Sequence, residues 1–376
     1  MEYLMLENLH DLQYWLMLNH KSHRLIYVIV LLILFAYIIR TITEKFRIPS
    51  VVGYIVLGTV CSISVVKQLP FLSKEFVAWY DYLLNTFNFI TVLAVSFISF
   101  SIGTSLSIKV LRRLELEFTA IVLLELIGAF VLVSGAMLAI GQPLFVAILL
   151  GTIATATAPA ATVMVLRDFS LQGELSATLM VVLALDEALA LIIFTFMEPF
   201  ALTTATPGAE ISFVGIFLLP LFKISSAIII GIIIGYISQR MMANCASESR
   251  KVLLILATIF GSSALAVFLH ISPLITNIAV GFAYRNFAVK RLEIAEKIDI
   301  LTVPLFAAFF ILAGTKIQIS NLLNLKFLII AVIYTTARIT GKLGGSYLGA
   351  KISSAPSEVQ KYLGFGLLPQ IGVAID

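Results

Sequence analysis

Long apolar segments separated by short polar loops dominate the sequence. A transmembrane helix needs about 20 mostly apolar residues, and twelve segments come close to that length. They lie near residues 25–42, 48–66, 86–106, 118–140, 143–166, 176–198, 211–238, 252–269, 272–288, 300–317, 326–350 and 359–376. The pattern predicts an all-α polytopic membrane protein, with residues 1–24 as an extracytoplasmic leader and residues 25–376 as a transmembrane domain. Because the last segment stops at Asp376 without a polar flank, we expect the domain to be truncated there and the full chain to hold about 13 helices.

Basic residues alternate between the two sides of this predicted membrane. The loops on one side carry 16 of the 25 Lys and Arg residues, whereas the opposite side carries six. Cytoplasmic loops are enriched in Lys and Arg, so we assign the basic side to the cytoplasm and the N-terminus to the outside. The compact loops favour a bacterial inner membrane. A wrong helix count would disrupt the alternation, so the bias also supports the segment map.

The composition agrees with a chain that is surrounded by lipid. It is 60% hydrophobic and 12% charged, against about 25% charged residues in soluble domains. The net charge of +4 gives no reason to expect a nucleic-acid partner. Two cysteines, Cys61 and Cys245, and four scattered histidines predict neither a disulfide framework nor a metal cluster. We expect no cofactor.

Ionisable residues interrupt several of the apolar segments. At the centre of a bilayer each costs about 2.5–3.5 kcal/mol on insertion scales, so they are rare there and often functional. Six lie away from the ends of the predicted spans, three acids and three bases: Glu125, Asp186, Glu187, Lys223, Arg338 and Lys342. Structural ion pairs between helices are the alternative interpretation, and we favour that one for Lys223, whose long stem could also reach an interface.

Asp186 and Glu187 form an adjacent acidic pair within an otherwise apolar segment. Neighbouring side chains on a helix point about 100° apart, so one basic partner cannot easily serve both. One acid can hold a structural pair while the other faces a cavity. A desolvated carboxylate gains by binding either a proton or a sodium ion, but not comfortably both. Such competition is the minimal requirement of an antiporter.

Two spans contain a break in their helical pattern. The fifth holds Thr157-Ala158-Pro159, and the twelfth holds Pro369 between glycines. Proline inside a helix removes a backbone hydrogen bond, which a membrane tolerates only where protein or a wet cavity satisfies the freed groups. A simple proline kink is the alternative for each break taken alone. Interrupted segments at matching places in two halves indicate an inverted-repeat transporter with a site near the membrane midplane.

Five short motifs, in this order, make the sequence from about residue 25 onward resemble the monovalent cation:proton antiporter superfamily, which includes the sodium/hydrogen exchanger family. They are Ile48-Pro49-Ser50-Val51-Val52-Gly53-Tyr54-Ile55-Val56-Leu57-Gly58, Thr157-Ala158-Pro159-Ala160-Ala161-Thr162, Leu185-Asp186-Glu187-Ala188-Leu189-Ala190, Gly341-Lys342-Leu343-Gly344-Gly345 and Pro369-Gln370-Ile371-Gly372-Val373-Ala374. The resemblance implies an inverted-repeat sodium/proton antiporter-like fold that forms a dimer. Spans four to six and eleven onward would carry the ion, and the other spans would form the dimer scaffold.

The resemblance also implies a function for individual residues. Glu187 takes the place of the acid that binds the ion, and Asp186 that of the acid paired with Lys342, which would release it when sodium arrives. Thr157 lies in the unwound segment near the ion. Arg338, one turn before Lys342, resembles an arginine that pairs with a glutamate in electroneutral relatives, and Glu125 is our candidate for that glutamate.

Two departures from the family pattern affect the expected site. Many relatives have an aspartate where this chain has Ala158, so one potential acidic ligand is missing. The second acid of the pair is Glu187 rather than aspartate, which is one methylene longer and leaves the ion selectivity open. The chain also has both Arg338 and Lys342, so the resemblance does not decide between electrogenic and electroneutral exchange.

These observations predict a sodium/proton antiporter, serving pH homeostasis by alternating access, with Na⁺ (or Li⁺) and H⁺ as substrates. A K⁺/H⁺ antiporter or a sodium-coupled symporter on the same fold is the alternative. An intramembrane enzyme is a weaker alternative, because the two acids of an aspartyl protease come from separate helices, whereas Asp186 and Glu187 are adjacent.

Overall fold

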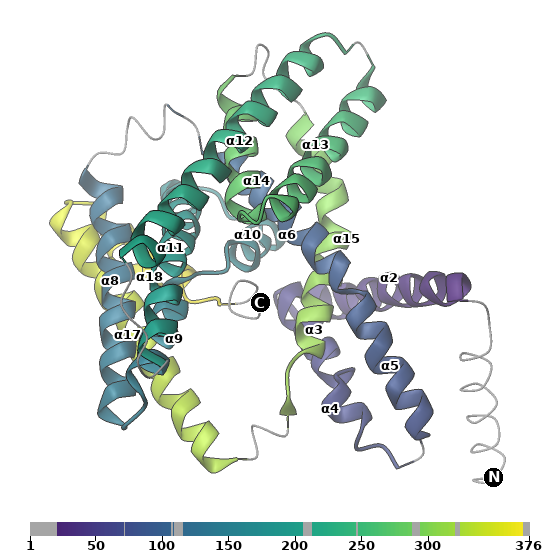
Figure 1. Cartoon of the computed structure of the whole chain (residues 1–376), viewed down its shortest axis with the longest axis horizontal. Helices are drawn as coiled ribbons and strands as arrows, with labels where there is room; N and C mark the ends of the chain where they lie inside the picture. Colours follow the sequence, from purple (N-terminus) through teal and green to yellow (C-terminus); the bar gives the residue numbers. More distant parts are fainter. Residues whose placement is uncertain are drawn as a thin grey trace. The chain divides into compact units, whose positions relative to one another are not determined.

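The structure is a computed structural model in which every regular element of the described part is a helix (Figure 1). The described residues are 21–70, 72–106, 108, 116–205, 213–245, 247–287, 294–319 and 324–370. All twelve predicted spans overlap a helix, so the predicted all-α architecture is confirmed. Most of the predicted leader lies outside the described residues, and its last four residues already belong to the first described helix.

The chain forms two compact units, whose boundaries fall within three of the helices. Unit 1 comprises residues 1–94 and 300–325. It contains α2 (Lys21–Phe46), α3 (Ser50–Val60), α4 (Ile63–Val66), α5 (Lys74–Thr86), the start of α6 (Asn88–Ser105) and most of α15 (Ile294–Thr315).

Unit 2 comprises residues 95–299 and 326–376 and contains the remaining helices. They are α8 (Leu116–Ala139), α9 (Leu144–Thr155), α10 (Pro159–Asp168), α11 (Glu174–Ala205), the π-helical turn η1 (Val214–Leu218), α12 (Leu219–Ala243), α13 (Glu248–Phe268), α14 (Pro273–Asn286), α17 (Leu325–Ile352) and α18 (Ser357–Gly366). The two units differ from the expected division into an ion-carrying bundle and a dimer scaffold. Helices α12 to α14, which we expected in the scaffold, share unit 2 with α8 to α11, which we expected in the bundle.

Six described segments are long and apolar enough to cross a membrane. They are Lys74–Thr104, Phe118–Ala139, Glu174–Ala205, Val214–Ala243, Glu248–Phe268 and Leu325–Ile352. Other predicted spans are shorter or divided: the predicted span 143–166 is split between α9 and α10, and only eight residues of the predicted span 359–376 belong to α18. Residues 371–376 lie outside the described part. These two interruptions coincide with Pro159 and Pro369, and the predicted span 48–66 is also divided, between α3 and α4.

Prolines mark several of the helix starts. Pro49, Pro143 and Pro356 are the N-cap residues of α3, α9 and α18, and Pro159 and Pro273 are the first residues of α10 and α14. Proline fits the first turn because the backbone N–H groups there have no partner within the helix, and its fixed φ suits the helix. These residues therefore decide where the short loops end.

Small residues allow α8 and α17 to approach each other closely (Figure 1). On α17, Gly341, Gly345 and Gly349 recur at intervals of four and so lie on one face. A Cβ atom added at Gly345 would lie 2.3 Å from the carbonyl oxygen of Leu124 and 2.6 Å from the Cα atom of Glu125. Small-residue stripes of this kind allow close backbone packing in membranes. The packing brings the backbone of Glu125 directly against α17.

Polar side chains join α6, α13 and α14 within unit 2. The Ser263 hydroxyl donates a hydrogen bond of 2.8 Å to the Ser96 hydroxyl, and the Asn277 amide donates one of 2.8 Å to Ser263. Ser262 donates to the Asn277 carbonyl oxygen, also at 2.8 Å. All four residues are buried. Hydrogen bonds of this kind link transmembrane helices where apolar packing alone cannot select a partner.

The close contact between α8 and α17 predicts that Gly345→Val destabilises the protein. The new side chain would meet backbone atoms rather than a flexible side chain, and overpacking costs about 1–3 kcal/mol. We expect a melting temperature several degrees lower in detergent. Gly344→Val is the matched control, because nothing lies within 4 Å of a Cβ at Gly344 on the same helix. Equal melting temperatures for the two variants would contradict this packing.

Candidate ion-binding site

The fifth predicted span is unwound in its middle. Helix α9 ends at Thr155, Ala156 is extended with φ −66° and ψ 136°, and α10 begins at Pro159. The intervening residues Thr157 and Ala158 are buried but belong to no helix. Proline at the first position of α10 prevents the two helices from joining, because it cannot donate the backbone hydrogen bond that a continuous helix needs.

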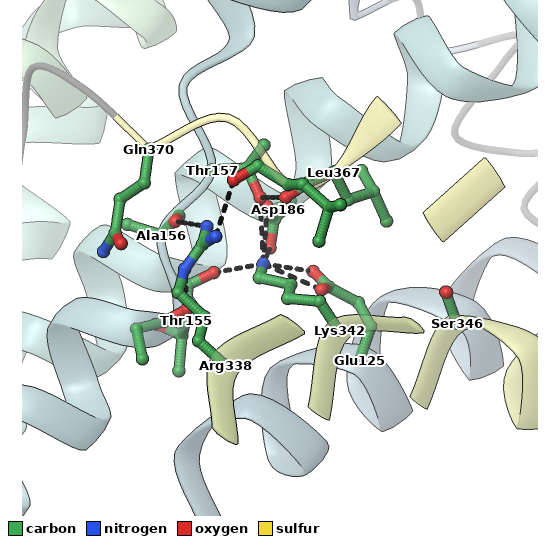
Figure 2. A network of polar contacts seen from close by, with 12 residues as sticks. Glu125, Thr155, Ala156, Thr157, Asp186, Arg338, Lys342, Ser346, Leu367 and Gln370 are labelled. Atoms are coloured by element: carbon green, nitrogen blue, oxygen red, sulfur yellow. Dashed lines mark hydrogen bonds and ion pairs between the residues drawn. The ribbon is translucent and has the colours of Figure 1, made fainter. Parts of the chain in front are cut away.

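A second unwound segment follows α18, and it lies beside the first (Figure 2). Residues 367–370 are non-helical. The backbone N–H of Ala158 donates to the carbonyl of Pro369 at 2.8 Å, and the Thr157 hydroxyl donates to the carbonyl of Leu367 at 3.2 Å. Thr162 adds a hydrogen bond of 2.8 Å to the Gly366 carbonyl. Each break therefore satisfies part of the hydrogen-bonding capacity that the other exposes.

Arg338 on α17 joins the two unwound segments. Its guanidinium group donates to the carbonyls of Ala154 at 3.1 Å, Ala156 at 2.9 Å and Leu368 at 2.6 Å. Only 4% of the residue is exposed. The carbonyls at a helix C-terminus carry partial negative charge, so a cation is favourable at the ends of α9 and α18.

The expected pairing of Arg338 with Glu125 is wrong. Glu125 instead forms an ion pair with Lys342, while Arg338 binds backbone carbonyls. The fork of a guanidinium group can reach several acceptors at once, and the two breaks supply such acceptors at the position of Arg338. Glu125 therefore pairs with Lys342, which lies one turn further along α17.

Lys342 is completely buried, and its ammonium group is the centre of the site (Figure 2). Nζ lies 2.7 Å from Oε2 and 3.0 Å from Oε1 of Glu125, and 3.2 Å from Oδ2 of Asp186. It also contacts the Thr157 hydroxyl at 2.9 Å and the Thr155 carbonyl oxygen. Glu125 and Asp186 are also fully buried, so these charges have no access to solvent in this conformation.

The ammonium group has more neighbours than it has protons. Three N–H bonds face oxygens of Glu125, Asp186, Thr155 and Thr157. Oε2 of Glu125 is close enough for an ion pair at 2.7 Å but receives no hydrogen bond. Carboxylate, carbonyl and hydroxyl oxygens are also the ligands that hard metal cations prefer. The site is therefore an oxygen-lined cation site in which the lysine itself is the present cation.

Four elements bring these groups together. Glu125 comes from α8, Thr155 from the end of α9, Asp186 from the middle of α11 and Lys342 from α17. The sequence indicated the contact of Lys342 with Asp186 only through the family resemblance. That Glu125 joins the same ammonium group was missed, although its isolation in an apolar helix marked it as a residue in need of a partner.

Glu187 and Lys223 are the other two ionisable residues that the sequence places within apolar spans. Glu187 belongs to α11, but its side chain is outside the described part, so its expected ion-binding function stays a prediction. The Lys223 side chain is exposed on α12 and forms no ion pair with any residue that the structure describes. The interhelical ion pair that we favoured for Lys223 is therefore not found there, and the exposed position fits the alternative of a stem that reaches an interface.

Known proteins place the chain in a family. Residues 30–375 match the family described as sodium/hydrogen exchanger, transmembrane. This protein belongs to the sodium/hydrogen exchanger family. The exchanger is thus a multi-pass membrane transporter rather than an enzyme, and the expected family is confirmed.

Individual relatives agree with this assignment. The exchanger is 24% identical to a Na⁺/H⁺ antiporter of Enterococcus hirae over 89% of its own chain and 83% of the relative's. It is 20% identical to the Na⁺/H⁺ antiporter NhaH of Halobacillus aidingensis, over 80% and 75% of the two chains.

Solved structures confirm the fold. Two structures of the sodium proton antiporter MjNhaP1 of Methanocaldococcus jannaschii are similar to this chain. One structure, at pH 8, has a TM-score of 0.69 and 17% identity over 95% of this chain and 88% of MjNhaP1. The other, an electron-microscopy map, has a TM-score of 0.71 and 15% identity over 93% and 84%. The expected sodium/proton antiporter-like fold is confirmed.

The three carbonyl contacts of Arg338 predict that Arg338→Lys destabilises the exchanger despite keeping the charge. A lysine cannot reproduce the fork that reaches both unwound segments, and each hydrogen bond to a charged group contributes about 1.5–3 kcal/mol. We expect a clear fall in melting temperature. The control is Arg240→Lys, since the exposed Arg240 bonds only the Tyr236 hydroxyl among described residues. Similar losses in both variants would refute the special position of Arg338.

Proposed function

We propose that this exchanger moves Na⁺ in one direction and H⁺ in the other, using the carboxylates around Lys342 as the shared binding site. The observation that carries the proposal is the fully buried ammonium group held between Glu125 and Asp186 where two unwound segments meet. Both relatives, from Enterococcus hirae and Halobacillus aidingensis, are named as Na⁺/H⁺ antiporters, which supports Na⁺ as the cation.

The charges in this site support competition between the two substrates. Ionised Glu125 and Asp186 carry two negative charges, and Lys342 supplies one positive charge within hydrogen-bond distance. One further positive charge would balance the site. A proton on a carboxylate and a bound sodium ion both supply it, so either can occupy the site, but the second arrives at a site that is already neutral. Competition of Na⁺ and H⁺ for these carboxylates would make their binding alternate.

The oxygens around Lys342 could also hold sodium. Glu125, Asp186, the Thr157 hydroxyl and the Thr155 carbonyl point towards one small volume (Figure 2). A sodium ion that takes some of these oxygens must displace the ammonium group from them, and the flexible stem of the lysine allows this movement. In this proposal Lys342 holds both carboxylates between transport events and releases Asp186 when sodium enters, while its charge stays within the site. Glu187 next to Asp186 would complete the ligands.

Transport further requires that the site open to each side of the membrane in turn. In the proposed cycle the helices that carry the site move relative to a scaffold in a homodimer, with the basic loops in the cytoplasm and the N-terminus outside, in a bacterial inner membrane. The unwound segments support such movement, since backbone that is held by side chains rather than by continuous helix can change partners. Alternating access, dimerisation and orientation are parts of the proposal.

Exchange can be measured in proteoliposomes with an imposed pH gradient and a fluorescent pH probe. We expect Na⁺ to dissipate the gradient and Glu187→Ala to abolish the response. Repeating the assay with the membrane voltage clamped by an ionophore shows whether net charge moves. A response to K⁺ but not to Na⁺ would replace sodium by potassium, and no response to either cation would refute antiport. Exchange at the wild-type rate in Glu187→Ala would refute the assignment of Glu187.

Asp186→Asn and Glu125→Gln should each lower the Na⁺-dependent rate by at least about tenfold, because each leaves Lys342 with one carboxylate and removes a negative charge that the bound sodium ion would balance. A tenfold change in rate corresponds to about 1.4 kcal/mol of activation free energy. This is less than the loss of folding stability expected when one partner of a buried ion pair is removed. Glu198→Gln is the matched control, an exposed carboxylate on the same helix as Asp186. Normal exchange by Glu125→Gln would restrict the ion site to α11.

A further inference from the structure

Unit 1 contains an apolar cavity that the proposed transport mechanism does not use. Its volume is about 250 Å³, and residues of α2, α3, α5 and α15 line it. We call it the unit-1 cavity. Its wall includes Leu57, Cys61, Trp79, Leu83, Ile311 and Leu312. Most of the other lining side chains are leucine or phenylalanine.

The two hydroxyl groups at the wall of the unit-1 cavity, on Tyr80 and Thr315, are already satisfied. The Tyr80 hydroxyl donates a hydrogen bond of 2.6 Å to the carbonyl of Cys61, and the Thr315 hydroxyl donates one of 2.7 Å to the carbonyl of Leu312. Water needs two to four polar partners to occupy a buried site, and apolar cavities without them stay dry. The cavity therefore suits hydrocarbon rather than water.

Hydrocarbon is available to this cavity from the membrane itself. Two of the lining residues, Leu31 and Phe35 on α2, are 46% and 41% exposed, so the cavity reaches the surface of unit 1. An apolar cavity of about 150 Å³ is already large enough to bind benzene. The larger unit-1 cavity can accept a segment of an acyl chain from the bilayer.

Three exposed lysines lie at the end of the helices that the cavity adjoins. Lys74 begins α5 two residues before the lining residue Phe76, and Lys316 follows the lining residue Thr315. Lys67 follows α4. Hydrogen bonds between Ser64 of α4 and the backbone of residues 317 and 319, at 3.3 and 3.2 Å, bring the regions of Lys67 and Lys316 together. Glu75 follows Lys74 directly in the first turn of α5.

Along α5, three aromatic residues of the cavity wall follow Lys74, and the apolar wall residues Leu83 and Leu84 follow them. The rings of Phe76 and Trp79 are 5.4 Å apart, and those of Phe76 and Tyr80 are 6.4 Å apart. All three residues line the cavity. Aromatic residues of this kind collect at the level of the lipid headgroups. The order from lysines through aromatic rings to apolar wall matches the order from phosphate to acyl chain in a lipid.

We propose that unit 1 binds one anionic phospholipid, with an acyl chain in the unit-1 cavity and its phosphate headgroup against Lys67, Lys74 and Lys316. The apolar wall selects the chain, and the lysines select the charge. Each lysine near a membrane surface strengthens binding of an anionic lipid about fivefold. The proposal does not depend on the transported ion, so it can fail or succeed independently of antiport.

Trp79 provides a direct probe, because it lines the cavity and the chain contains only one other tryptophan, Trp15. In a Trp15→Phe background, bromine on a lipid acyl chain quenches Trp79 fluorescence on contact. The protein is reconstituted in phosphatidylcholine that contains small fractions of brominated phosphatidylglycerol. We expect quenching well above that predicted from the mole fraction of the brominated lipid. Brominated phosphatidylcholine at the same fractions should give no such excess.

Variants separate the cavity from the lysines. Leu57→Phe and Leu84→Phe each place a ring in the cavity and should remove the excess quenching, whereas Lys67→Gln, Lys74→Gln and Lys316→Gln should each weaken it about fivefold. Lys361→Gln, an exposed lysine on α18 in unit 2, is the control and should leave it unchanged. Unchanged melting temperatures show that the variants fold.

Two outcomes would overturn the proposal. Quenching that follows the mole fraction in every variant means that Trp79 meets only bulk lipid and that no site exists. Equal excess for brominated phosphatidylcholine and brominated phosphatidylglycerol means that the cavity accepts a chain without selecting the headgroup.

Discussion

The ammonium group of Lys342 is removed from solvent entirely, and the arrangement of unit 2 around it follows from that burial. Taking an ion out of water costs several kcal/mol even in real proteins, and only close opposite charge and good hydrogen bonds offset the cost. Glu125, Asp186, Thr155 and Thr157 supply these from α8, α11 and the broken span between α9 and α10. A shift of any one of these elements would leave a buried charge without its partner, so their positions are energetically coupled.

The two unwound segments face the same constraint in their backbone. Within a bilayer, freed N–H and C=O groups must find partners in the protein. Part of the solution is mutual, as in the hydrogen bond from Ala158 to Pro369. The rest comes from Arg338 and Gln370: the Gln370 amide donates to the Ile153 carbonyl at 2.7 Å and is itself held by the hydroxyl of Tyr334. Because side chains rather than a continuous helix hold the two unwound segments together, these segments can rearrange more easily than a regular helix can.

Sequence alone was sufficient for the helical architecture, because a lipid-embedded helix needs a long apolar segment and each such segment is visible. It also located both helix breaks, since Pro159 and Pro369 interrupt otherwise apolar spans. What it could not supply was the choice of partner across helices. Arg338 and Lys342 lie one turn apart on one face of α17, so spacing places both near the same neighbours and cannot tell which of them meets Glu125. That choice depends on how closely α8 approaches α17, which Gly345 and its neighbours determine through contacts that are far apart in sequence.

The chemistry of the two cations explains why each occupies its own position. Arginine presents a rigid planar fork, and Arg338 uses it for three carbonyls that belong to different segments. Lysine presents a compact charge on a flexible stem, and the ammonium group of Lys342 contacts several oxygens, any of which it can exchange for another partner. An arginine is therefore better suited to hold the two unwound segments together, and a lysine is better suited to release an acid when another cation arrives. Because Arg338 is engaged with backbone carbonyls, Lys342 is the basic group that contacts the carboxylates Glu125 and Asp186 in the described part of the site. Under the proposed function the balance between sodium and protons therefore depends on Lys342 and its acids, while Arg338 keeps the surrounding backbone in the geometry on which that balance relies.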